Sequence, residues 1–424
     1  MTKKFDRRKF LQGSIAAGAG TVAGFPHIWS NSAGLAMAAS GEIEVGVLFS
    51  LTGGLSIVEK SLSDATLMAI SEINAAGGVL GKMIKPIVED GASDPKTYNE
   101  KASKLVLRDR VPTTFGGYTS ASRKAVLPVY EKRKNVFFYP TFYEGYECSK
   151  NVVYAGGGVP NQQLDNFIPW IIKTLGKKKF FIVGSNYVYP REMAKVTKIL
   201  VEQNGGEWVA DEYLELGHSE WGAMVKKIKD SGCDVVLSNV VGSSLVSFYR
   251  EYKAQGLTMD KLPICATVTS EIEVAAMGAE YAAGSYSSFP YHMAIDTPAN
   301  KSFIERYRKF TNDPKAVTHM ALHSAYFEVF LWKQAVEKAG KATPAGILEG
   351  IKGQSFDAPG GKITVDGENL HVYMTPRIAQ WQSDGTSKII DEYPSALRPL
   401  PYSAYGETSD NLFCSASGLD TKKL

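Results

Sequence analysis

Apolar residues follow two alternating patterns between residues 42 and 290. Short runs rich in Val, Ile, Phe and Leu are followed by longer stretches in which apolar residues recur every three or four positions. The first pattern is typical of buried strands, and the second of helices that cover a sheet. In the first part of the chain, strands are predicted at 42–51, 84–88, 111–117, 136–139 and 152–155. Helices are predicted among them at 61–75, 95–108 and 120–132.

The same alternation starts again near Gln162. Strands are predicted at 179–184, 207–213, 234–239 and 262–266, with helices at 162–175, 190–203, 220–229 and 243–254. Two long helices follow, at 298–310 and 317–339, and the alternating stretch 360–390 carries Gly-Gly and Asp-Gly turns that favour a β-hairpin. Because strands that alternate with helices form parallel sheets, we expect two similar α/β halves.

The restart of the pattern and the two long helices indicate that the chain passes between these halves several times. Crossings are expected near 156–160, 289–294 and 357–362. This predicts a lobe 1 built from residues 39–159 and 292–360. Lobe 2 is expected to comprise residues 160–291 and 361–400, and residues 401–424 to form a C-terminal tail.

Composition and charge narrow the function. The chain has 424 residues, 44% apolar and 21% charged, which is ordinary for a soluble globular protein. Its formal charge is +3, but the first 38 residues hold five basic residues against Asp6 alone, which leaves about −1 for the rest. A near-neutral body argues against a nucleic acid partner. After the first few dozen residues no apolar run approaches the roughly 18 residues that cross a bilayer, so stable membrane insertion of the mature chain is not expected.

Residues 1–38 have the features of an export signal. The run from Asp6 to Gln12, with its paired Arg7 and Arg8, resembles the twin-arginine export motif. A weakly apolar stretch follows, and Ala36-Met37-Ala38 has small residues at the two positions that a signal peptidase needs. We expect a cleaved twin-arginine signal peptide and a mature protein in the periplasm. An uncleaved membrane anchor is the alternative interpretation.

Ligands of open parallel sheets bind at the carboxyl ends of the strands. The loops at these ends are rich in Tyr, Ser and Thr and poor in charge. They are predicted at 51–54, 117–122, 139–144, 184–190, 239–244 and 267–271. If two sheets face each other, these loops meet between them.

Several of these loops carry motifs of a known family. The residues from Gly117 to Pro128 read GYTSASRKAVLP, those from Tyr139 to Gly145 read YPTFYEG, and those from Gly184 to Arg191 read GSNYVYPR. With Ile73–Gly78 and Thr269–Glu271, they resemble the urea and short-chain amide binding proteins of ABC importers, and the amide-sensing regulator of aliphatic amidase operons. The resemblance implies a type I periplasmic-binding fold, with two doubly wound parallel-sheet lobes joined by three crossover strands and the ligand between them.

The motifs depart from the urea binders at two places. Those proteins usually carry Trp where Tyr118 stands, and Val-Gln where Thr141-Phe142 stand. At both places the sequence is more similar to the amide sensor, whereas Asn161-Gln162-Gln163 is more similar to the urea binders. Both urea and a small amide therefore stay open as ligands.

The candidate ligand-binding residues all stand at predicted strand ends. They are Tyr118, Ser120, Tyr139, Thr141, Tyr187, Tyr189 and Glu271. Ser120 begins a helix, where it either caps the helix or donates to a ligand carbonyl. The Tyr139 and Thr141 hydroxyls can accept from an amide N–H2 group. Glu271 is either a ligand contact or a solvated acid in the first turn of a helix.

Other chemistry is not expected. The sequence has no GxxxxGK[ST] phosphate loop and no GxSxG nucleophile motif, and His319 and His323 lack a third metal ligand at recognisable spacing. We therefore expect no cofactor, no metal and no enzyme. The expected function is a solute-binding protein that delivers urea or a short amide to an ABC permease, with a ligand sensor or regulator as the alternative. Because such ligands and hydroxyl groups do not titrate near neutrality, binding is predicted to vary little between pH 6 and pH 8.

Overall fold

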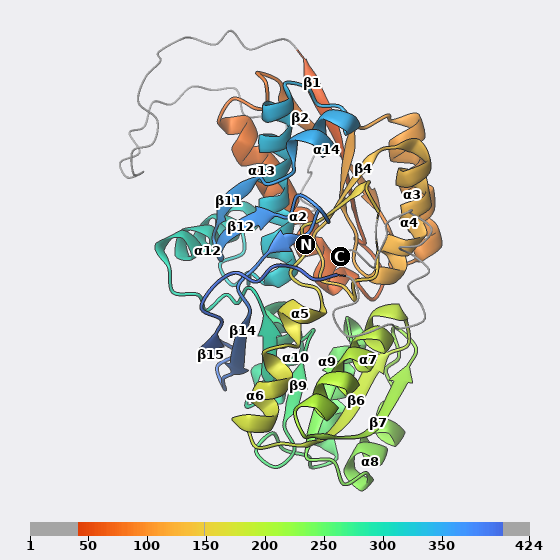
Figure 1. Ribbon diagram of the computed structural model, residues 1–424, viewed down its shortest axis with the longest axis vertical. Coiled ribbons are helices and arrows are strands. Elements are labelled where there is room, and N and C mark those ends of the chain that lie inside the picture. The colour runs from red at the N-terminus through yellow and green to blue at the C-terminus, as the bar shows by residue number, and fades with distance from the viewer. Residues whose placement is uncertain (1–40, 148, 402–424) are drawn as a thin grey trace, which may run out of the picture. The chain divides into compact units, whose positions relative to one another are not determined.

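A computed structural model describes residues 41–147 and 149–401 (Figure 1). The predicted signal peptide at 1–38 and nearly all of the predicted tail at 401–424 lie outside the described residues. In the described part of the chain, no helix is long and apolar enough to cross a membrane.

The first half of the chain forms a parallel sheet of five strands in the order β2-β1-β3-β4-β5. Its strands are β1 (Glu42–Phe49), β2 (Met83–Asp90), β3 (Thr113–Gly116), β4 (Val136–Tyr139) and β5 (Val152–Tyr154). Its helices are α2 (Ser56–Ala75), α3 (Pro95–Ser103), the π-helix η1 (Lys104–Arg108) and α4 (Ser120–Arg133). Fully buried Val, Leu and Phe side chains from β1, β3 and β4 lie in the core, which explains why apolar runs marked these strands.

Local sequence signals explain where several helices begin. Asp94 accepts a hydrogen bond from the backbone N–H of Thr97, and proline occupies the first position of α3. Thr297 and Thr343 cap the later helices α12 (Pro298–Thr311) and α14 (Pro344–Gly350) in the same way. A threonine or an aspartate before a proline therefore marks the start of three helices. The third of these, α14, was not among the helices predicted from the sequence.

The second sheet has seven strands in the order β15-β14-β10-β9-β8-β6-β7. Its parallel strands are β6 (Lys179–Ser185), β7 (Glu207–Leu214), β8 (Val235–Asn239), β9 (Ile264–Ala266) and β10 (Tyr286–Phe289). Its helices are α6 (Phe167–Lys173), α7 (Val188–Gln203), α8 (Gly222–Asp230), α9 (Ser243–Ala254), α10 (Glu271–Met277) and α11 (Ala279–Ala282). The serine-rich β10 was not predicted; it is buried because Ser287 and Ser288 donate to the backbone carbonyls of Thr269 and Gln163.

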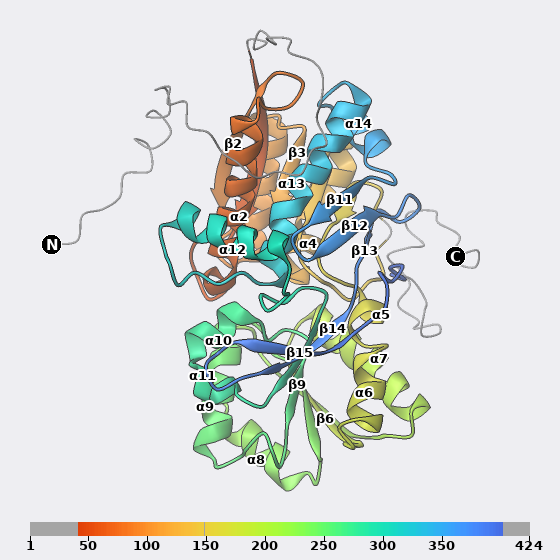
Figure 2. The ribbon, with the colours of Figure 1, turned by 90° about the vertical axis from the view of Figure 1, so that its left-hand side faces the viewer.

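The prediction of one hairpin in residues 360–390 was wrong. This stretch is divided between two sheets (Figure 2). A separate antiparallel sheet contains β11 (Ser355–Ala358), β12 (Gly361–Val365) and β13 (Val372–Tyr373), and β11 packs against α13 (Met320–Ala339). The antiparallel pair β14 (Arg377–Trp381) and β15 (Ser387–Glu392) joins the second sheet through β10.

The chain passes between the two large sheets after β5, after β10 and after β13. The predicted crossing at 357–362 is instead the turn between β11 and β12, where Asp357 pairs with Lys362. The third passage falls between Tyr373 and Arg377. The predicted helix 162–175 also proves to be two short helices, α5 (Pro160–Gln163) and α6, with α5 lying in the first crossing.

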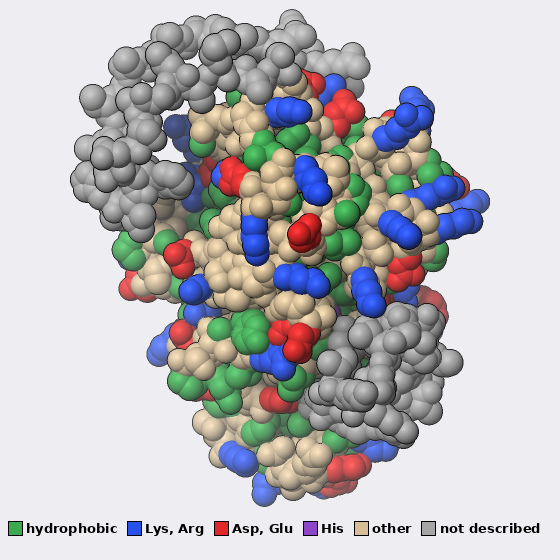
Figure 3. Space-filling view, turned by 45° about the horizontal axis from the view of Figure 1, so that its top comes forward, with side chains coloured by type: hydrophobic (Ala, Val, Ile, Leu, Met, Phe, Trp, Pro, Cys, Tyr) green, Lys and Arg blue, Asp and Glu red, His purple; other side chains and the backbone are tan. Residues whose placement is uncertain are grey.

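Charged side chains of both signs are exposed on the surface. On the face shown in Figure 3, Lys and Arg side chains are scattered, with Asp and Glu side chains among them. No large patch of one sign gathers among the described residues on that face, as expected of a near-neutral body.

Candidate functional site

Loops at the carboxyl ends of the two large sheets contact each other. A Cβ atom on Gly54, which follows β1, would lie 3.2 Å from the hydroxyl of Ser243, at the start of α9. A Cβ atom on Gly242 would lie 3.1 Å from the Leu55 side chain. Helix α2 packs against α10, and α4 packs against α7. The predicted ligand loops of both sheets are therefore neighbours.

An aromatic cluster joins the two sheets in this region. The ring centroid of Phe142 lies 6.4 Å from Tyr118, 5.5 Å from Tyr189 and 5.6 Å from Phe289. The ring of Tyr187 lies 6.5 Å from Tyr189. Three predicted residues thus come together here. Phe142 was not predicted as a contact, although it stands inside the YPTFYEG motif that pointed to the site.

Burial keeps the four candidate tyrosines protonated. Loss of hydration raises the pKa of Tyr118, Tyr139, Tyr187 and Tyr189 above the ordinary value. The charges of Glu273 and Glu59 add to this effect at Tyr118, whereas the Arg123 charge opposes it at Tyr139 and Tyr187. All four hydroxyls therefore stay neutral at physiological pH.

Ser120 belongs to a buried charged cluster. Its hydroxyl donates to Glu144 at 2.5 Å and accepts from Arg123 at 3.0 Å. Arg123 also forms ion pairs with Glu144 at 2.9 Å and with Glu147 at 2.8 Å. Burial alone would raise the pKa of Glu147, but the Arg123 guanidinium lowers it below the ordinary value.

This cluster corrects the expected role of Ser120. The cap of α4 is Thr119, whose hydroxyl accepts from the Ala121 backbone N–H at 3.3 Å. The Ser120 proton is used inside the protein, so Ser120 has none left for a ligand carbonyl. Glu144 and Glu147 were missed, because they lie in the loop after β4, more than 20 residues beyond Arg123, and approach it only in the folded chain.

The Arg123 charge is fully compensated. Glu144 and Glu147 outnumber it, and Lys124 lies 3.4 Å from Glu147, so these four charges sum to zero. The guanidinium also lies over the rings of Tyr139 and Tyr143, at 4.8 Å and 4.3 Å from their centroids. Arg123 therefore organises the site without presenting a free positive charge.

The hydroxyl groups of Thr141 and Tyr139 differ in the hydrogen bonds that they can still form with a ligand. The Thr141 hydroxyl donates to the backbone carbonyl of Gly117 at 2.9 Å, so it can only accept from a ligand. The Tyr139 hydroxyl is fully buried and has no hydrogen-bond partner within the described residues. An unpaired buried hydroxyl at a strand end is a candidate ligand contact.

The second sheet contributes a chain of polar groups that was only partly predicted. The single proton of the Tyr189 hydroxyl lies within hydrogen-bonding distance of two acceptors, the Thr267 hydroxyl at 3.1 Å and the Gln163 side-chain carbonyl at 3.2 Å. The Thr267 hydroxyl in turn donates to the side-chain carbonyl of Asn239 at 2.5 Å. Asn239 and Thr267 stand in two of the loops that were predicted at the carboxyl ends of the strands. Each of these loops contains further Ser or Thr residues, so the sequence offered no reason to choose Asn239 or Thr267 as a site residue.

Glu271 is buried, so it is not a solvated first-turn acid. One of its carboxylate oxygens accepts from the Met293 backbone N–H at 2.7 Å, and the other has no partner in the described chain. His292 lies 3.9 Å away. Burial raises the Glu271 pKa to about 8. These contacts belong to the crossing after β10 and involve none of the four tyrosines.

Two other buried acids act on Tyr118 instead. Glu273 accepts from the backbone N–H and the hydroxyl of Ser270, at 3.0 Å and 2.5 Å, and burial raises its pKa to about 7. Glu59 accepts from the Ser50 backbone N–H at 2.7 Å and from the Tyr98 hydroxyl, and burial raises its pKa to about 8. Both carboxyl groups raise the pKa of Tyr118. Neither acid was predicted.

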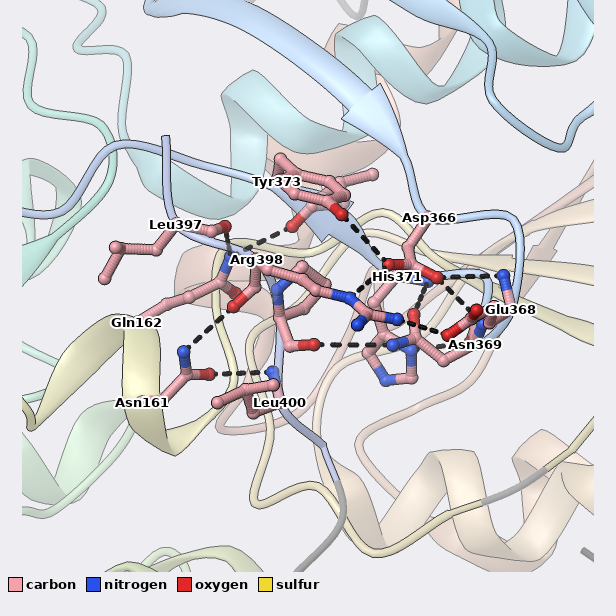
Figure 4. Close-up of polar contacts among 12 residues, drawn as sticks. Asn161, Gln162, Asp366, Glu368, Asn369, His371, Tyr373, Leu397, Arg398 and Leu400 are labelled. Atoms are coloured by element: carbon pink, nitrogen blue, oxygen red, sulfur yellow. Dashed lines mark hydrogen bonds and ion pairs between the residues drawn. The ribbon is translucent and has the colours of Figure 1, made fainter. Parts of the chain in front are cut away.

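The segment that follows β15 returns to the crossings (Figure 4). Asn161 of α5 donates to the Arg398 carbonyl and accepts from the Leu400 backbone N–H, both at 2.9 Å. The Gln162 side chain donates to the carbonyls of Val372 and Leu397 at 3.0 Å. Helix α5 in the first crossing is thus tied to β13 and to the segment after β15, so the Asn161-Gln162 part of the family motif has a structural role.

Metal chemistry finds no support within the described residues. No group of three or more His, Cys, Asp or Glu side chains there is arranged to hold a metal ion. His319 is hydrogen-bonded to Ser61 at 2.8 Å, and His323 accepts from the Gly360 backbone N–H at 3.0 Å and stacks on Tyr291. A surface hollow of about 760 Å³ near Glu42, Lys82 and Arg110 lies at the amino end of β1, away from the tyrosines.

Comparison with known proteins agrees with this architecture. The family model described as "Periplasmic binding protein domain" matches residues 43–408. The leucine-, isoleucine-, valine-, threonine- and alanine-binding protein of Pseudomonas aeruginosa is 25% identical over 350 residues, covering 82% of this chain and 92% of that protein. The leucine-specific-binding protein of Salmonella typhimurium is 21% identical, covering 82% and 93%.

Solved structures show the same fold. A solute binding protein of an ABC transporter from R. palustris, in complex with 4-hydroxybenzoate, has a TM-score of 0.76 and 22% identity, covering 84% of this chain and 98% of that one. A branched-chain amino acid transporter substrate binding protein from Streptococcus pneumoniae, in complex with isoleucine, has a TM-score of 0.73 and 21% identity, covering 84% and 100%. The type I periplasmic binding fold expected from the sequence is confirmed.

Proposed function

Since the chain belongs to the periplasmic binding protein family and is a solute-binding protein of the ABC type, we propose that its ligand is urea or a short-chain aliphatic amide, which it delivers to an ABC permease. The ligand lies between the two large sheets, among Tyr118, Tyr139, Tyr187 and Tyr189. The two lobes close around it by a hinge motion at the crossings.

The observation that carries this proposal is the compensated charge of Arg123, the buried arginine whose guanidinium lies over the Tyr139 ring. Glu144 and Glu147 compensate this charge. A carboxylate that enters a closed, poorly hydrated site without a positive partner costs several kcal/mol. Neutral hydroxyl and amide groups suit a neutral ligand that carries a carbonyl and an N–H2 group.

The aromatic contacts favour a small ligand. Phe142 touches rings from both sheets, with centroid distances between 5.5 Å and 6.4 Å. Rings at these distances are in direct contact. Urea, formamide and acetamide are small enough to lie beside such a cluster without separating it.

A branched-chain amino acid is the second candidate. The relatives from P. aeruginosa and S. typhimurium are named for such ligands. The unpaired oxygen of Glu271 could accept from an ammonium group. Against this candidate, the contacts of Glu271 lie at the crossing after β10 rather than at the tyrosines.

Calorimetric titration of the mature protein tests the proposal. The panel is urea, formamide, acetamide, leucine, isoleucine and 4-hydroxybenzoate. Urea or one of the amides is expected to bind, and the three carboxylate ligands are expected not to bind. Tight leucine binding without binding of any neutral ligand would show that the proposal is wrong, and Glu271→Gln would then test Glu271 as the ammonium partner.

Export can be tested separately. We propose that residues 1–38 direct the chain to the twin-arginine route and are removed after Ala38. Replacing Arg7 and Arg8 by lysine is then expected to leave the precursor in the cytoplasm, as measured by cell fractionation. Normal periplasmic accumulation of this variant would indicate another export route.

A further inference from the structure

Asn239 presents a buried donor that no described residue accepts. It ends β8, its side chain is fully buried, and its Nδ2 atom has no hydrogen-bond partner within the described residues. Most buried polar groups are hydrogen-bonded, and exceptions call for an explanation. Asn239 was not among the predicted site residues.

The neighbours of Asn239 fix the direction of its amide. The Tyr189 hydroxyl donates to Thr267, and the Thr267 hydroxyl donates onward to Oδ1 of Asn239 at 2.5 Å. The side-chain amide of Gln163 also fixes Thr267, because it donates to the Thr267 backbone carbonyl at 3.3 Å. With Oδ1 turned toward Thr267, the Nδ2 donor of Asn239 points away from this chain of hydroxyls.

The position of Asn239 is at the boundary between the two sheets. The loop that follows it contains Gly242 and Ser243, which approach Leu55 and Gly54 of the first sheet. Its hydroxyl chain ends at Tyr189, whose ring contacts Phe142 of the first sheet. The unpaired donor therefore lies close to the segments in which the two sheets meet.

We propose that the Asn239 side chain donates a hydrogen bond to the carbonyl oxygen of the ligand, and that Thr267 and Tyr189 position it for this task. This deepens the proposed function and rests on it. It makes Asn239 a specificity-determining contact for the acceptor end of a neutral amide, while the first sheet offers hydroxyl groups to the rest of the ligand.

Two substitutions of Asn239 test the donor. Asn239→Asp keeps the oxygen that accepts from Thr267 but replaces the donor by an acceptor. At pH 8 it is expected to weaken binding of whichever of urea, formamide or acetamide the wild type binds best, by at least about 10-fold. Asn239→Leu removes the donor without adding charge and is expected to weaken binding similarly. Asn312→Asp, at an exposed helix end, is the control for the added charge and is expected to bind like the wild type.

The pH dependence of Asn239→Asp gives a signature that a purely structural residue would not show. A buried aspartic acid has a raised pKa and is protonated at mildly acidic pH, where its O–H again supplies a donor. The ratio of wild-type to Asn239→Asp affinity is therefore expected to fall from pH 8 to pH 5, while the ratio for Asn239→Leu stays constant. Using ratios cancels the titration of Glu59, Glu271 and Glu273, which all these proteins share.

Thr267 provides a second, independent pair of variants. Thr267→Ser keeps the hydroxyl and is expected to bind nearly as the wild type does. Thr267→Val loses it, frees the Asn239 amide to turn, and is expected to bind several-fold more weakly. If thermal unfolding shows that the Asn239 variants do not fold, the two Thr267 variants alone test whether the Asn239 donor binds the ligand.

The possible outcomes separate this inference from the proposed function. Unchanged or tighter amide binding by Asn239→Asp at pH 8 overturns the donor role, as does equal binding by the two Thr267 variants. If the wild type binds leucine or 4-hydroxybenzoate and no neutral ligand, the proposed function fails. The same variants titrated with that ligand then decide whether Asn239 donates to its carboxylate.

Discussion

Three buried carboxyl groups, those of Glu59, Glu271 and Glu273, make stability depend on pH. Burial raises the pKa of Glu59 to about 8, of Glu271 to about 8 and of Glu273 to about 7, from an ordinary value of 4.5. The folded protein therefore holds these protons more tightly than the unfolded chain does. Their contribution to stability is complete below about pH 4.5 and is lost as the pH rises toward 7 or 8.

Glu59→Gln is expected to reduce this loss. Glutamine keeps a carbonyl that accepts from the Ser50 backbone N–H but has no proton to lose. Each pH unit between the two pKa values of Glu59 is worth about 1.4 kcal/mol, so the wild type should lose stability relative to Glu59→Gln between pH 5 and pH 8. Guanidinium chloride unfolding measures this, since urea is a proposed ligand. The exposed Glu349→Gln is the control, and parallel pH profiles of wild type and Glu59→Gln would contradict the expectation.

The same acids bear on one expectation drawn from the sequence. Hydroxyl groups and neutral ligands do not titrate near neutrality, so binding was predicted to be nearly constant from pH 6 to pH 8. The hydroxyl part of this reasoning holds, because burial raises the tyrosine pKa values further. That reasoning left out Glu59, Glu271 and Glu273, whose pKa values burial raises to about 7 to 8, so constant binding from pH 6 to pH 8 stays a prediction.

Tyr139→Phe separates binding from stability at a single hydroxyl. The Tyr139 hydroxyl is buried without a partner in the described protein, so its removal is expected to leave stability unchanged or to raise it by about 1 kcal/mol. Affinity for the best neutral ligand is expected to fall about 3- to 10-fold. Calorimetry and thermal unfolding measure the two effects.

Tyr130→Phe is the matched control. The Tyr130 hydroxyl is also buried and unpaired, but its ring stacks on Phe137 at 4.8 Å, behind the site. This variant is expected to change stability in the same direction and to bind like the wild type. Equal affinities of wild type and Tyr139→Phe would remove Tyr139 from the site.

At the scale of elements, Arg123 joins α4 to the loop that follows β4. Its ion pairs reach Glu144 and Glu147 in that loop, and both acids are nearly fully buried. Since Thr141 and Phe142 belong to the same loop, the cluster holds two site residues relative to α4. A buried ion pair contributes less to stability than its breakage costs, because a lone buried charge is left behind.

Arg123→Met is expected to destabilise the protein by about 3–5 kcal/mol at pH 7, measured by guanidinium chloride unfolding. The difference from wild type should shrink toward pH 4. The wild type there loses the stability that depends on an ionised Glu147, whereas the variant protonates its lone acids at higher pH. Adding Glu144→Gln and Glu147→Gln to Arg123→Met is the control and should recover much of the loss. A loss independent of pH would indicate packing rather than charge.

Helices and strands with a regular pattern of apolar residues could be predicted from the sequence. Elements whose buried polar side chains depend on hydrogen bonds to distant segments could not. The strand at 136–139 and the helix at 243–254 have the bounds that were predicted. The strand β10 reads Tyr-Ser-Ser-Phe and is stable in the core only because its hydroxyls find backbone carbonyls from other segments. The alternating stretch 360–390 predicted strands correctly but not their sheet, because alternation does not identify a partner strand.

At the scale of the whole molecule, the fold and the approach of the carboxyl-end loops could be predicted from the sequence, while the hydrogen bonds in these loops could not. The carboxyl-end rule selected loops that do meet. It could not show that the protons of Ser120 and Thr141 are used internally, since Glu144 and the Gly117 carbonyl approach them only in three dimensions. The lobe boundaries and the ligand contacts stay predictions.

Closure of the lobes on the ligand can be tested where the two sheets approach most directly. A Cβ atom on Gly54 would lie 3.2 Å from the Ser243 side-chain oxygen, a separation compatible with the geometry of a disulfide. The variant with both Gly54→Cys and Ser243→Cys is therefore expected to form this bond in the closed state. If the ligand favours closure, saturating urea or acetamide should accelerate bond formation, because it raises the closed population.

Peptide mapping by mass spectrometry follows the bond separately from the natural cysteines, and each single-cysteine variant is a control. Ligand bound before oxidation should then dissociate more slowly until a reductant is added. Equal oxidation rates with and without a ligand that calorimetry shows to bind would mean that binding does not close the lobes.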